Sequence, residues 1–184
     1  MTDVTIKIIH HGDSTRIQQA TDLYKSKSVG KLHLGQFPVL EVHARENVLF
    51  GATNDDGELR GVLLAGAVDI QTRKDYEGYV SPSVLTPRTI EILDTAVLPA
   101  YRRQGVGTAL VQAAIELYEK NGFHRFLTAS RFGGCGSDSS FGLLLRLGFE
   151  VLREVQEYYR GSSFQCPDCE GTCLCSGYLM LREE

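Results

Sequence analysis

The segment from Thr95 to Leu110, with the sequence TAVLPAYRRQGVGTAL, decides the fold. An apolar run ends at a proline, a basic turn with two glycines follows, and an amphipathic pattern begins at once. The first turn of a helix has backbone N–H groups without partners and carries the positive end of the helix dipole. Glycine lets a phosphate group approach that backbone, and the arginines of the turn add positive charge. The segment therefore predicts a strand, a turn and a helix that together bind a phosphate-bearing ligand.

Glycine spacing excludes two common nucleotide-binding patterns. The chain has no Gly-x-x-x-x-Gly-Lys-Ser/Thr sequence, so a Walker-type loop is excluded. The turn at Gly105 and Gly107 also lacks the third glycine and the downstream acidic residue of a dinucleotide-binding fold. The phosphate-bearing ligand is therefore expected to be held by another kind of glycine turn.

The rest of the chain alternates between strand and helix patterns. Residues 104–120 carry apolar side chains at spacings of three and four, which is typical of an amphipathic helix. Residues 48–53 and 59–69 are apolar runs joined by Asn-Asp-Asp-Gly, which predicts a hairpin because Gly tolerates positive φ. Further strands are expected at residues 4–10, 89–97, 126–129, 149–159 and 176–182, helices at 14–27 (capped by Asp13 or Ser14), 37–45 and 139–147, and a long loop at 71–88.

This order of elements predicts the fold class. Strands interspersed with helices favour a mixed α/β sheet with helices covering both of its faces. The length of 184 residues suits one domain, and a hydrophobic content of 42% provides for a sizeable core. We therefore expect a single domain over residues 1–184.

Charge and hydropathy disfavour several classes of partner. Nineteen basic against 23 acidic side chains leave a formal charge of −4, whereas nucleic-acid binders usually have a basic excess, so no nucleic acid is expected. The longest apolar stretch, residues 62–68, is far shorter than the ~20 residues that cross a bilayer, so no membrane is expected. The first residues lack the basic and apolar regions of a signal peptide, which favours a cytoplasmic protein.

The glycine turn also carries a family resemblance. The sequence RRQGVG at residues 102–107 resembles motif A of the GNAT superfamily of acyl-CoA-dependent N-acyltransferases, whose signature is Arg/Gln-x-x-Gly-x-Gly/Ala. The resemblance extends in detail over residues 89–149, and Gly148-Phe149 is similar to the family's Gly-Phe landmark after the last helix. It implies the GNAT fold, with a mixed, mostly antiparallel central sheet flanked by helices on both faces. It also implies N-acetyltransferase activity with acetyl-CoA as the co-substrate.

The resemblance implies a set of cofactor-binding residues. Backbone at the end of the strand before the turn holds the pantetheine arm in this family, and the turn holds the pyrophosphate. A backbone N–H near Val97 would stabilise the oxyanion. One further residue, Ser137, falls near the position where many members have an asparagine that contacts the cofactor. The implied cofactor-binding residues are Thr95, Ala96, Val97, Arg102, Arg103, Gln104, Gly105, Val106, Gly107, Thr108 and Ser137.

Acyl transfer to an amine requires a base, and a carboxylate is a usual one. Some members of the family carry a glutamate base on the strand that leads into the turn, where this chain has Glu91. Asp94 is the alternative base, although strand alternation would place it on the opposite face from Glu91 unless a bulge intervenes. Other members place the base on the next strand, where Thr128 stands here and cannot serve.

The general acid departs from the family pattern. A tyrosine commonly lies four residues before the Gly-Phe landmark, and this position is Leu144. Tyr158 and Tyr159 are candidates for the missing acid, and because consecutive strand residues face opposite ways, at most one of them is expected to point into the cleft. Solvent, or a group of the neighbouring loop such as Cys135, Ser137 or Ser139, stays an alternative proton donor.

Four cysteines fall in one ten-residue window, as Cys166, Cys169, Cys173 and Cys175. Clustering of this kind, with a Cys-x-x-Cys pair, favours a structural zinc ion held by four thiolates, with disulfides or a redox role as alternatives. Four thiolates leave no open position, so a catalytic zinc ion is not expected. The Cys-rich loop at residues 165–176 is expected between the last two strands, beside the acceptor site that the resemblance implies.

The function expected from the sequence is acetyl transfer from acetyl-CoA to a primary amine by direct attack in a ternary complex. The acceptor is either a small-molecule amine or a protein amine, and a homodimer is possible because dimers are common in the family. The alternative is a catalytically silent acyl-CoA sensor or an interaction module that uses the Cys-rich loop, which the absence of the tyrosine at Leu144 keeps open.

Overall fold

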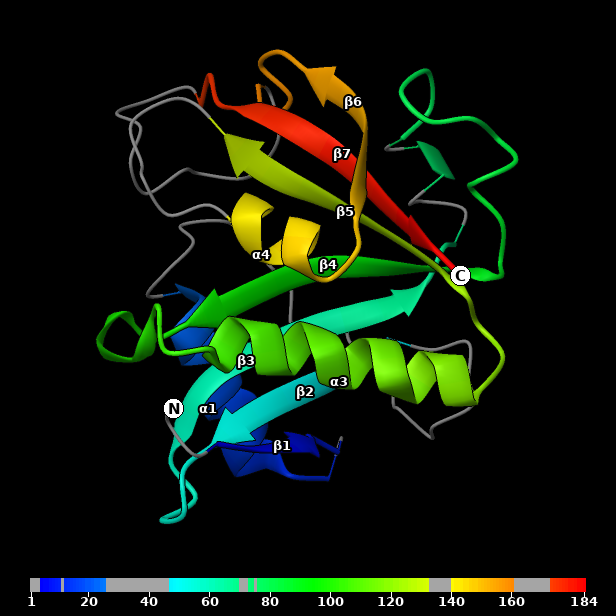
Figure 1. Ribbon diagram of the computed structural model, residues 1–184. Coiled ribbons are helices and arrows are strands. Elements are labelled where there is room, and N and C mark those ends of the chain that lie inside the picture. The colour runs from blue at the N-terminus through cyan, green and yellow to red at the C-terminus, as the bar shows by residue number, and fades with distance from the viewer. Residues whose placement is uncertain are drawn as a thin grey trace.

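A sheet of seven strands runs through the described part of the chain, in the order β1-β2-β3-β4-β5-β7-β6 (Figure 1). The structure is a computed structural model that describes residues 4–10, 12–25, 47–69, 73–74, 76–132, 140–160 and 173–184. The strands are β1 (Thr5–Ile8), β2 (Val48–Thr53), β3 (Leu59–Ala67), β4 (Thr89–Val97), β5 (Arg125–Phe132), β6 (Glu150–Val155) and β7 (Ser176–Glu183). The helices are α1 (Ser14–Lys25), α3 (Val106–Lys120), α4 (Phe141–Arg146) and the 3₁₀ helix η2 (Pro99–Tyr101).

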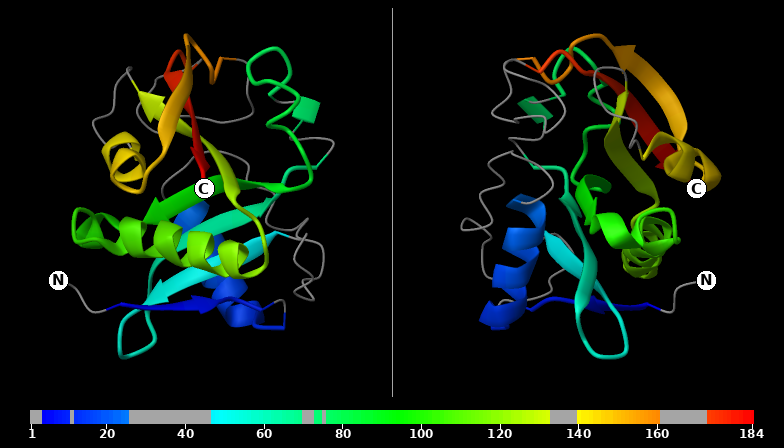
Figure 2. Two further views of the ribbon diagram at one scale, coloured as in Figure 1. Left: turned by 45° about the vertical axis from the view of Figure 1, so that its right-hand side comes forward. Right: turned by 90° about the vertical axis from the view of Figure 1, so that its left-hand side faces the viewer.

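Helices cover both faces of this sheet, as the sequence predicted. Figure 2 shows α1 on one face, and α3 and α4 on the other. Of the strand pairs that the structure describes, β4–β5 is parallel and the others are antiparallel. The predicted mixed, mostly antiparallel sheet is therefore confirmed. Residues 37–45, where a helix was expected, lie outside the described residues.

Local signals near the N-terminus are confirmed. The carboxylate of Asp13 accepts a hydrogen bond from the backbone N–H of Arg16 at 3.0 Å, so Asp13 is the N-cap of α1. The β2–β3 hairpin turns at Gly57, whose φ is +80° and whose N–H donates to the carbonyl of Asn54 at 3.0 Å. No helix among the described residues is long and apolar enough to span a membrane.

The parallel pair β4–β5 is short, and the two strands separate near the middle of the sheet. The two strands pair from Thr89 with Arg125 to Ile92 with Thr128 and then diverge (Figure 1). At the last pair, the buried hydroxyl of Thr128 donates a hydrogen bond to the carbonyl of Ile92 at 2.9 Å. Thr128 therefore stabilises the backbone at the point of divergence, which fits the expectation that it is not a base.

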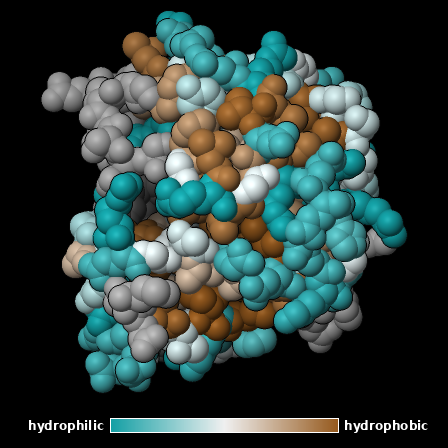
Figure 3. Space-filling view, viewed as in Figure 1, coloured by the Kyte–Doolittle hydropathy of each residue, from teal (hydrophilic) through white to brown (hydrophobic). Residues whose placement is uncertain are grey.

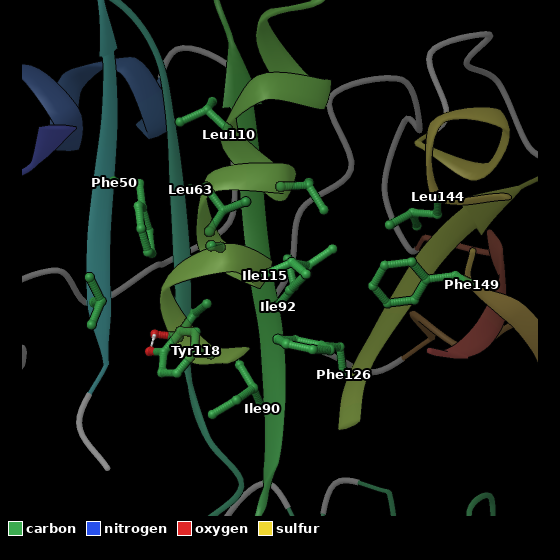
Figure 4. Close-up of a cluster of buried hydrophobic side chains, with 14 of the residues drawn as sticks. Phe50, Leu63, Ile90, Ile92, Leu110, Ile115, Tyr118, Phe126, Leu144 and Phe149 are labelled. Atoms are coloured by element: carbon green, nitrogen blue, oxygen red, sulfur yellow. Dashed lines mark hydrogen bonds between the residues drawn. The ribbon is translucent and has the colours of Figure 1, made fainter. Parts of the chain in front are cut away.

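The main core lies between the sheet and the face covered by α3 and α4. Figure 4 shows Ile92, Phe126, Leu144 and Phe149 packed together in this core. The phenol of Tyr118, from the last turn of α3, donates a hydrogen bond to the carbonyl of Ala65 in β3 at 2.9 Å (Figure 4). This bond is buried, and it attaches the end of the helix to the sheet.

A second cluster lies on the opposite face of the sheet, over β5 and β7. Its cover comes from the segment before β4, which the sequence predicted only as a long polar loop. Tyr76, Val80 and Leu85 of this segment are buried against Leu127 and Leu179. The segment is therefore part of the core. Its apolar residues show no helical or strand spacing in the sequence because they lie in turns.

We expect Tyr118→Phe to lower the free energy of unfolding by about 1–2 kcal/mol, because the carbonyl of Ala65 loses a buried donor. Urea unfolding followed by circular dichroism measures this change. Tyr178→Phe is the matched control, because its ring stacks on Phe132 but its hydroxyl has no hydrogen bond within the described part of the chain. Equal losses in the two variants would contradict the prediction.

Candidate active site

The glycine turn forms an open cradle at the start of α3. Gly105 is the N-cap of α3, with φ at +89°, and no side chain caps the helix. A Cβ built on Gly105 would meet no atom within 4 Å, so the space outside the turn is open. Arg103 also has a positive φ, +61°. Left-handed residues of this kind, next to a helix start, turn successive N–H groups toward one anion-binding concavity.

Side chains of the turn brace it from within. Arg102 donates from Nε to the carbonyl of Val97 at 3.2 Å, and Gln104 donates from Nε2 to the carbonyl of Ala100 at 2.7 Å. Arg60 of β3 lies over the ring of Tyr101 at 3.9 Å, a cation–π contact that holds η2 against the sheet. The sequence predicted that Arg102 and Arg103 add positive charge to the turn. The hydrogen bond to Val97 gives Arg102 an additional, structural role.

The remaining predicted cofactor residues have distinct environments. A Cβ on Gly107 would lie 3.2 Å from Cδ1 of Leu143, so this glycine lets α4 pack close to the start of α3. Val106 is buried in the main core, which leaves only its backbone facing the cradle. Ser137 lies outside the described residues.

A β-bulge at Leu93 brings the two candidate bases to one face of the sheet. Ile92 pairs with Ala65 and Asp94 pairs with Leu64, so Leu93 is the extra residue on β4. Cross-strand partners share a face, and the bulge therefore places Asp94 on the same face as Glu91, opposite α3. The simple alternation that separated these two side chains is wrong for β4, and the alternative with a bulge holds.

Burial raises the pKa of Asp94 to about 6, while a hydrogen bond from the backbone N–H of Thr95 opposes that rise. Its carboxyl group therefore keeps some basicity near neutral pH without losing its charge there. Perturbed acids of this kind are typical of functional sites, although buried structural acids show similar shifts.

Glu91 is positioned by a residue that the sequence analysis did not single out. The phenol of Tyr76 donates a hydrogen bond to Oε1 of Glu91 at 2.8 Å. Burial, and next the charge of Glu91, raise the pKa of Tyr76 well above its ordinary value, so this phenol stays a donor. No sequence signal distinguished Tyr76, because the segment before β4 has no period and its fold is set by contacts with β5 and β7.

Comparison with known proteins agrees with this geometry. The model of the acetyltransferase (GNAT) family matches residues 17–149, more than half of the chain. The chain belongs to the GNAT acetyltransferase family. No curated protein shows significant sequence similarity to it.

Several solved structures have the same fold as this acetyltransferase. A GNAT family acetyltransferase from Elizabethkingia anophelis with acetyl-CoA bound has 16% identity and a TM-score of 0.67, with 100% of each chain covered. A Bacillus subtilis acetyltransferase in complex with CoA has 18% identity and a TM-score of 0.67, with 99% of each chain covered. The ribosomal-protein-S18-alanine N-acetyltransferase from Escherichia coli has 17% identity and a TM-score of 0.61, covering 98% of this chain and 94% of its own. At these identities the likeness shows the fold alone.

The two tyrosines after β6 differ from the strand arrangement that was predicted. β6 ends at Val155, and the following residues form turns in which Glu157 has a φ of +51°. The rings of Tyr158 and Tyr159 lie 5.0 Å apart and edge to face, rather than on opposite faces of a strand. The ring of Tyr158 covers Gly177, where an added Cβ would lie 2.9 Å from Cδ1 of the tyrosine.

Tyr159 lies in the same electrostatic environment as Asp94. Burial and the neighbouring Tyr158 raise the pKa of Tyr159 well above its ordinary value, Arg131 lowers it, and Asp94 and Cys173 raise it further. The family's usual tyrosine position offers no such group here, because Leu144 is buried in the main core (Figure 4). Of the two candidate tyrosines, Tyr159 is therefore the one whose pKa is raised by the charge of Asp94.

The cysteine cluster is only partly described. Cys173 and Cys175 are both buried, and they pack against Tyr159. Cys166 and Cys169, like Cys135 and Ser139, lie outside the described residues. No group of three His, Cys, Asp or Glu side chains that could hold a metal ion occurs within the described ranges. The four-thiolate zinc site therefore stays a prediction.

We expect Asp94→Asn to raise the free energy of unfolding at pH 7.5 by about 2 kcal/mol and to leave it nearly unchanged at pH 4. A folded-state pKa above the unfolded value of ~3.9 means that the folded protein binds the proton more tightly. Its stability therefore falls as the pH rises from about 4 to about 6, and asparagine removes this penalty while keeping an acceptor for Thr95. Urea unfolding at the two pH values measures the difference, and an equal effect at both would refute the assignment.

Proposed function

We propose that this acetyltransferase transfers the acetyl group of acetyl-CoA to a primary amine, which attacks directly while both substrates are bound. The observation that carries this proposal is the arrangement along β4. One strand, Thr89–Val97, leads into the phosphate cradle at its end and presents Glu91 and Asp94 on the face opposite α3. The cofactor and the acceptor would then approach the diverging strands from opposite faces.

The residues of the cradle fit the phosphates of acetyl-CoA. The N–H groups at the start of α3 and the left-handed turn suit a pyrophosphate, and the open space at Gly105 admits it. The exposed Arg103 and the braced Arg102 would add positive charge, and the backbone of residues 95–97 would hold the pantetheine arm. When bound, acetyl-CoA supplies the acetyl thioester, and the chain's own residues hold the acceptor and move its proton.

Asp94 is the better supported base of the pair. Its carboxyl group adjoins Thr95, where the acetyl end of the cofactor is expected, and a pKa of about 6 gives it useful basicity near neutral pH. Glu91 is held by Tyr76 in the paired part of β4. We therefore assign proton removal to Asp94 and the orientation of the acceptor ammonium to Glu91.

Tyr159 is the proton donor that we propose for the departing thiolate, in place of the family's tyrosine. Its raised pKa keeps the phenol protonated, and the charge of Asp94 contributes to that rise. The predicted structural zinc ion is retained in this proposal as a brace for the adjoining wall, supported by the two buried thiols beside Tyr159. The two half-buried acids on one face of β4 favour an enzyme over a silent acyl-CoA sensor.

A homodimer is the predicted assembly, and one surface feature bears on it. Figure 3 shows hydrophobic side chains gathered over the part of the front face where Figure 1 places α4 and β6. Leu145, Val151 and Leu152 are among the exposed large hydrophobic residues there. Exposed apolar patches are typical of protein interfaces, so this patch supports the prediction of a dimer.

We expect Gly105→Glu to weaken acetyl-CoA binding at least tenfold, because a carboxylate would occupy the open space of the cradle and repel the phosphates. Isothermal titration calorimetry measures the affinity. Gly57→Glu is the matched control, since Gly57 also has a positive φ and open space around its Cβ position but lies in the β2–β3 hairpin. Both variants should lose similar stability, and only the first should lose affinity; parallel affinity losses would remove the cradle from the proposal.

We expect Asp94→Asn to lower kcat at least a hundredfold with acetyl-CoA affinity intact, because general-base catalysis is worth about 10²–10⁴-fold. The assay is release of free CoA during transfer to a panel of primary amines. In the unchanged protein, the acid limb of the kcat/KM profile should fall near pH 6, as the Asp94 pKa predicts.

Glu91→Gln should act mainly on the KM of the amine in the same assay, since we assign Glu91 to orientation. If Glu91→Gln abolished transfer and Asp94→Asn did not, the base would be Glu91. If neither variant changed the rate, the acid pair would be structural. A protein that binds acetyl-CoA and acetylates no amine would be the silent sensor.

A further inference from the structure

A basic hollow lies beyond the acid pair, on the same face of the sheet. It has a volume of about 640 Å³ and is bounded by the turns before β4 and by β6. Arg73, Lys74 and Arg153 line it, together with one acidic residue, Glu77, and the ring of Tyr79. Volumes of ~300–1,000 Å³ are typical of small-molecule sites. The hollow is therefore large enough for part of a ligand.

A second β-bulge directs Arg153 into this hollow. Val151 pairs with Met180 and Arg153 pairs with Leu179, so Leu152 is the extra residue on β6. Because of the bulge, Arg153 shares a face with Leu179 rather than with the main core behind Met180. Its NH1 donates to the carbonyl of Gly78 at 2.9 Å, which fixes the guanidinium at the rim.

The positive charge of the hollow is not neutralised within the described part of the chain. None of the three cations there forms an ion pair with a described residue, and among the described lining residues Glu77 is the one with a carboxylate. The whole chain carries a formal charge of −4, so three cations around one hollow stand out from the rest of the surface. Concave basic surfaces of this kind attract anions.

The hollow is connected to the acid pair through one turn of the chain. The backbone carbonyl of Tyr76 accepts hydrogen bonds from the N–H groups of Tyr79 and Val80, so residues 76–80 form one compact unit. The first residue of this unit holds Glu91 through its phenol, and the last four line the hollow. A ligand in the hollow would therefore lie against the element that positions Glu91.

A row of tyrosine rings makes the same connection along the surface. The ring of Tyr79 lies edge to face with that of Tyr158 at 5.9 Å, and Tyr158 in turn contacts Tyr159 at 5.0 Å. Tyr159 is the ring whose pKa responds to Asp94. The row thus runs from Tyr159 to the hollow, and its rings offer an apolar surface for the body of an acceptor.

We propose that the hollow binds an anionic group of the acceptor, a carboxylate or a phosphate, while the amine of the same molecule lies at Asp94 and Glu91. The substrate class is then a primary amine with a negative charge at its far end, joined by a segment that spans the tyrosine row. This inference rests on the proposed function for the position of the amine. The acid pair attracts any protonated amine and so does not discriminate among acceptors. The cations of the hollow would select those acceptors that also carry an anionic group.

Binding without turnover is the first test. The CoA-saturated protein, in which the phosphate cradle is already filled, is titrated with ε-aminocaproate and separately with its neutral amide, and backbone amide signals are followed by NMR. We expect ε-aminocaproate to shift the signals of Gly78 and Val80 together with that of Thr95, with Gly57 unchanged as an internal reference. Its amide should bind about tenfold more weakly, since two exposed or half-exposed charge contacts are worth about that factor.

Charge removal is the second test. In the double variant Arg73→Gln/Lys74→Gln, the KM for ε-aminocaproate should rise about tenfold at a nearly constant kcat, and the KM for its amide should not change. Aminobutyl phosphate and aminobutanol form the corresponding phosphate pair. The double variant Lys7→Gln/Lys120→Gln is the control, because it removes the same charge from exposed positions outside the hollow.

The outcomes separate this inference from the proposed function. Shifts at Gly78 and Val80 that persist unchanged in the Arg73→Gln/Lys74→Gln variant, or no shifts there at all, would overturn the inference, even if other amines are acetylated. Equal affinity and KM for the charged and neutral acceptors would also overturn it. Charge-selective binding at both ends without acetyl transfer would support the binding site and overturn the proposed function instead.

Discussion

The early divergence of β4 from β5 is the constraint on which the rest of the site depends. A parallel pair that continued past Ile92 and Thr128 would join the two strands through the middle of the sheet and leave no passage between its faces. At the last pair before the strands diverge, the buried hydroxyl of Thr128 donates a hydrogen bond to the carbonyl of Ile92. Thr128 therefore stabilises the backbone where the two strands diverge, because its hydroxyl supplies a buried donor that an apolar side chain lacks.

Two β-bulges, one in β4 and one in β6, place charged side chains on the face of the sheet opposite α3. Each inserts one leucine into a strand, Leu93 in β4 and Leu152 in β6, and both leucines are largely exposed. The consequence is the same in both strands, because the polar residue after the bulge moves to the face opposite α3. Asp94 and Arg153 reach that face in this way. A residue that would have faced the main core is thereby placed where a charged side chain can meet solvent and a ligand.

The sequence predicted the parts of this molecule that depend on local chemistry. The glycine turn at Gly105, the N-cap at Asp13 and the hairpin at Gly57 each need a particular residue at a particular φ or with a particular acceptor, so pattern and structure agree. The GNAT fold followed from the first of these. The bulges could not be predicted, because alternation of polar and apolar residues indicates which face a side chain takes only while the register is unbroken. Tyr76 could not be predicted either, since its hydrogen bond to Glu91 depends on a turn that is shaped by contacts with β5 and β7.

The distribution of charge explains how an acidic chain can handle an anionic cofactor and an amine on one strand. At the end of β4, the proposed anion binding would use backbone N–H groups and a helix dipole, which carry no formal charge, so few arginines are needed there. On the opposite face, Glu91 and Asp94 are the carboxylates proposed to meet the amine, and burial rather than a cation raises the pKa of Asp94. An arginine next to Asp94 would lower the pKa of the Asp94 carboxyl group and make it a weaker base. No cation of the hollow is among the causes of the Asp94 pKa shift, so these cations can attract the anionic end of an acceptor without weakening the proposed base.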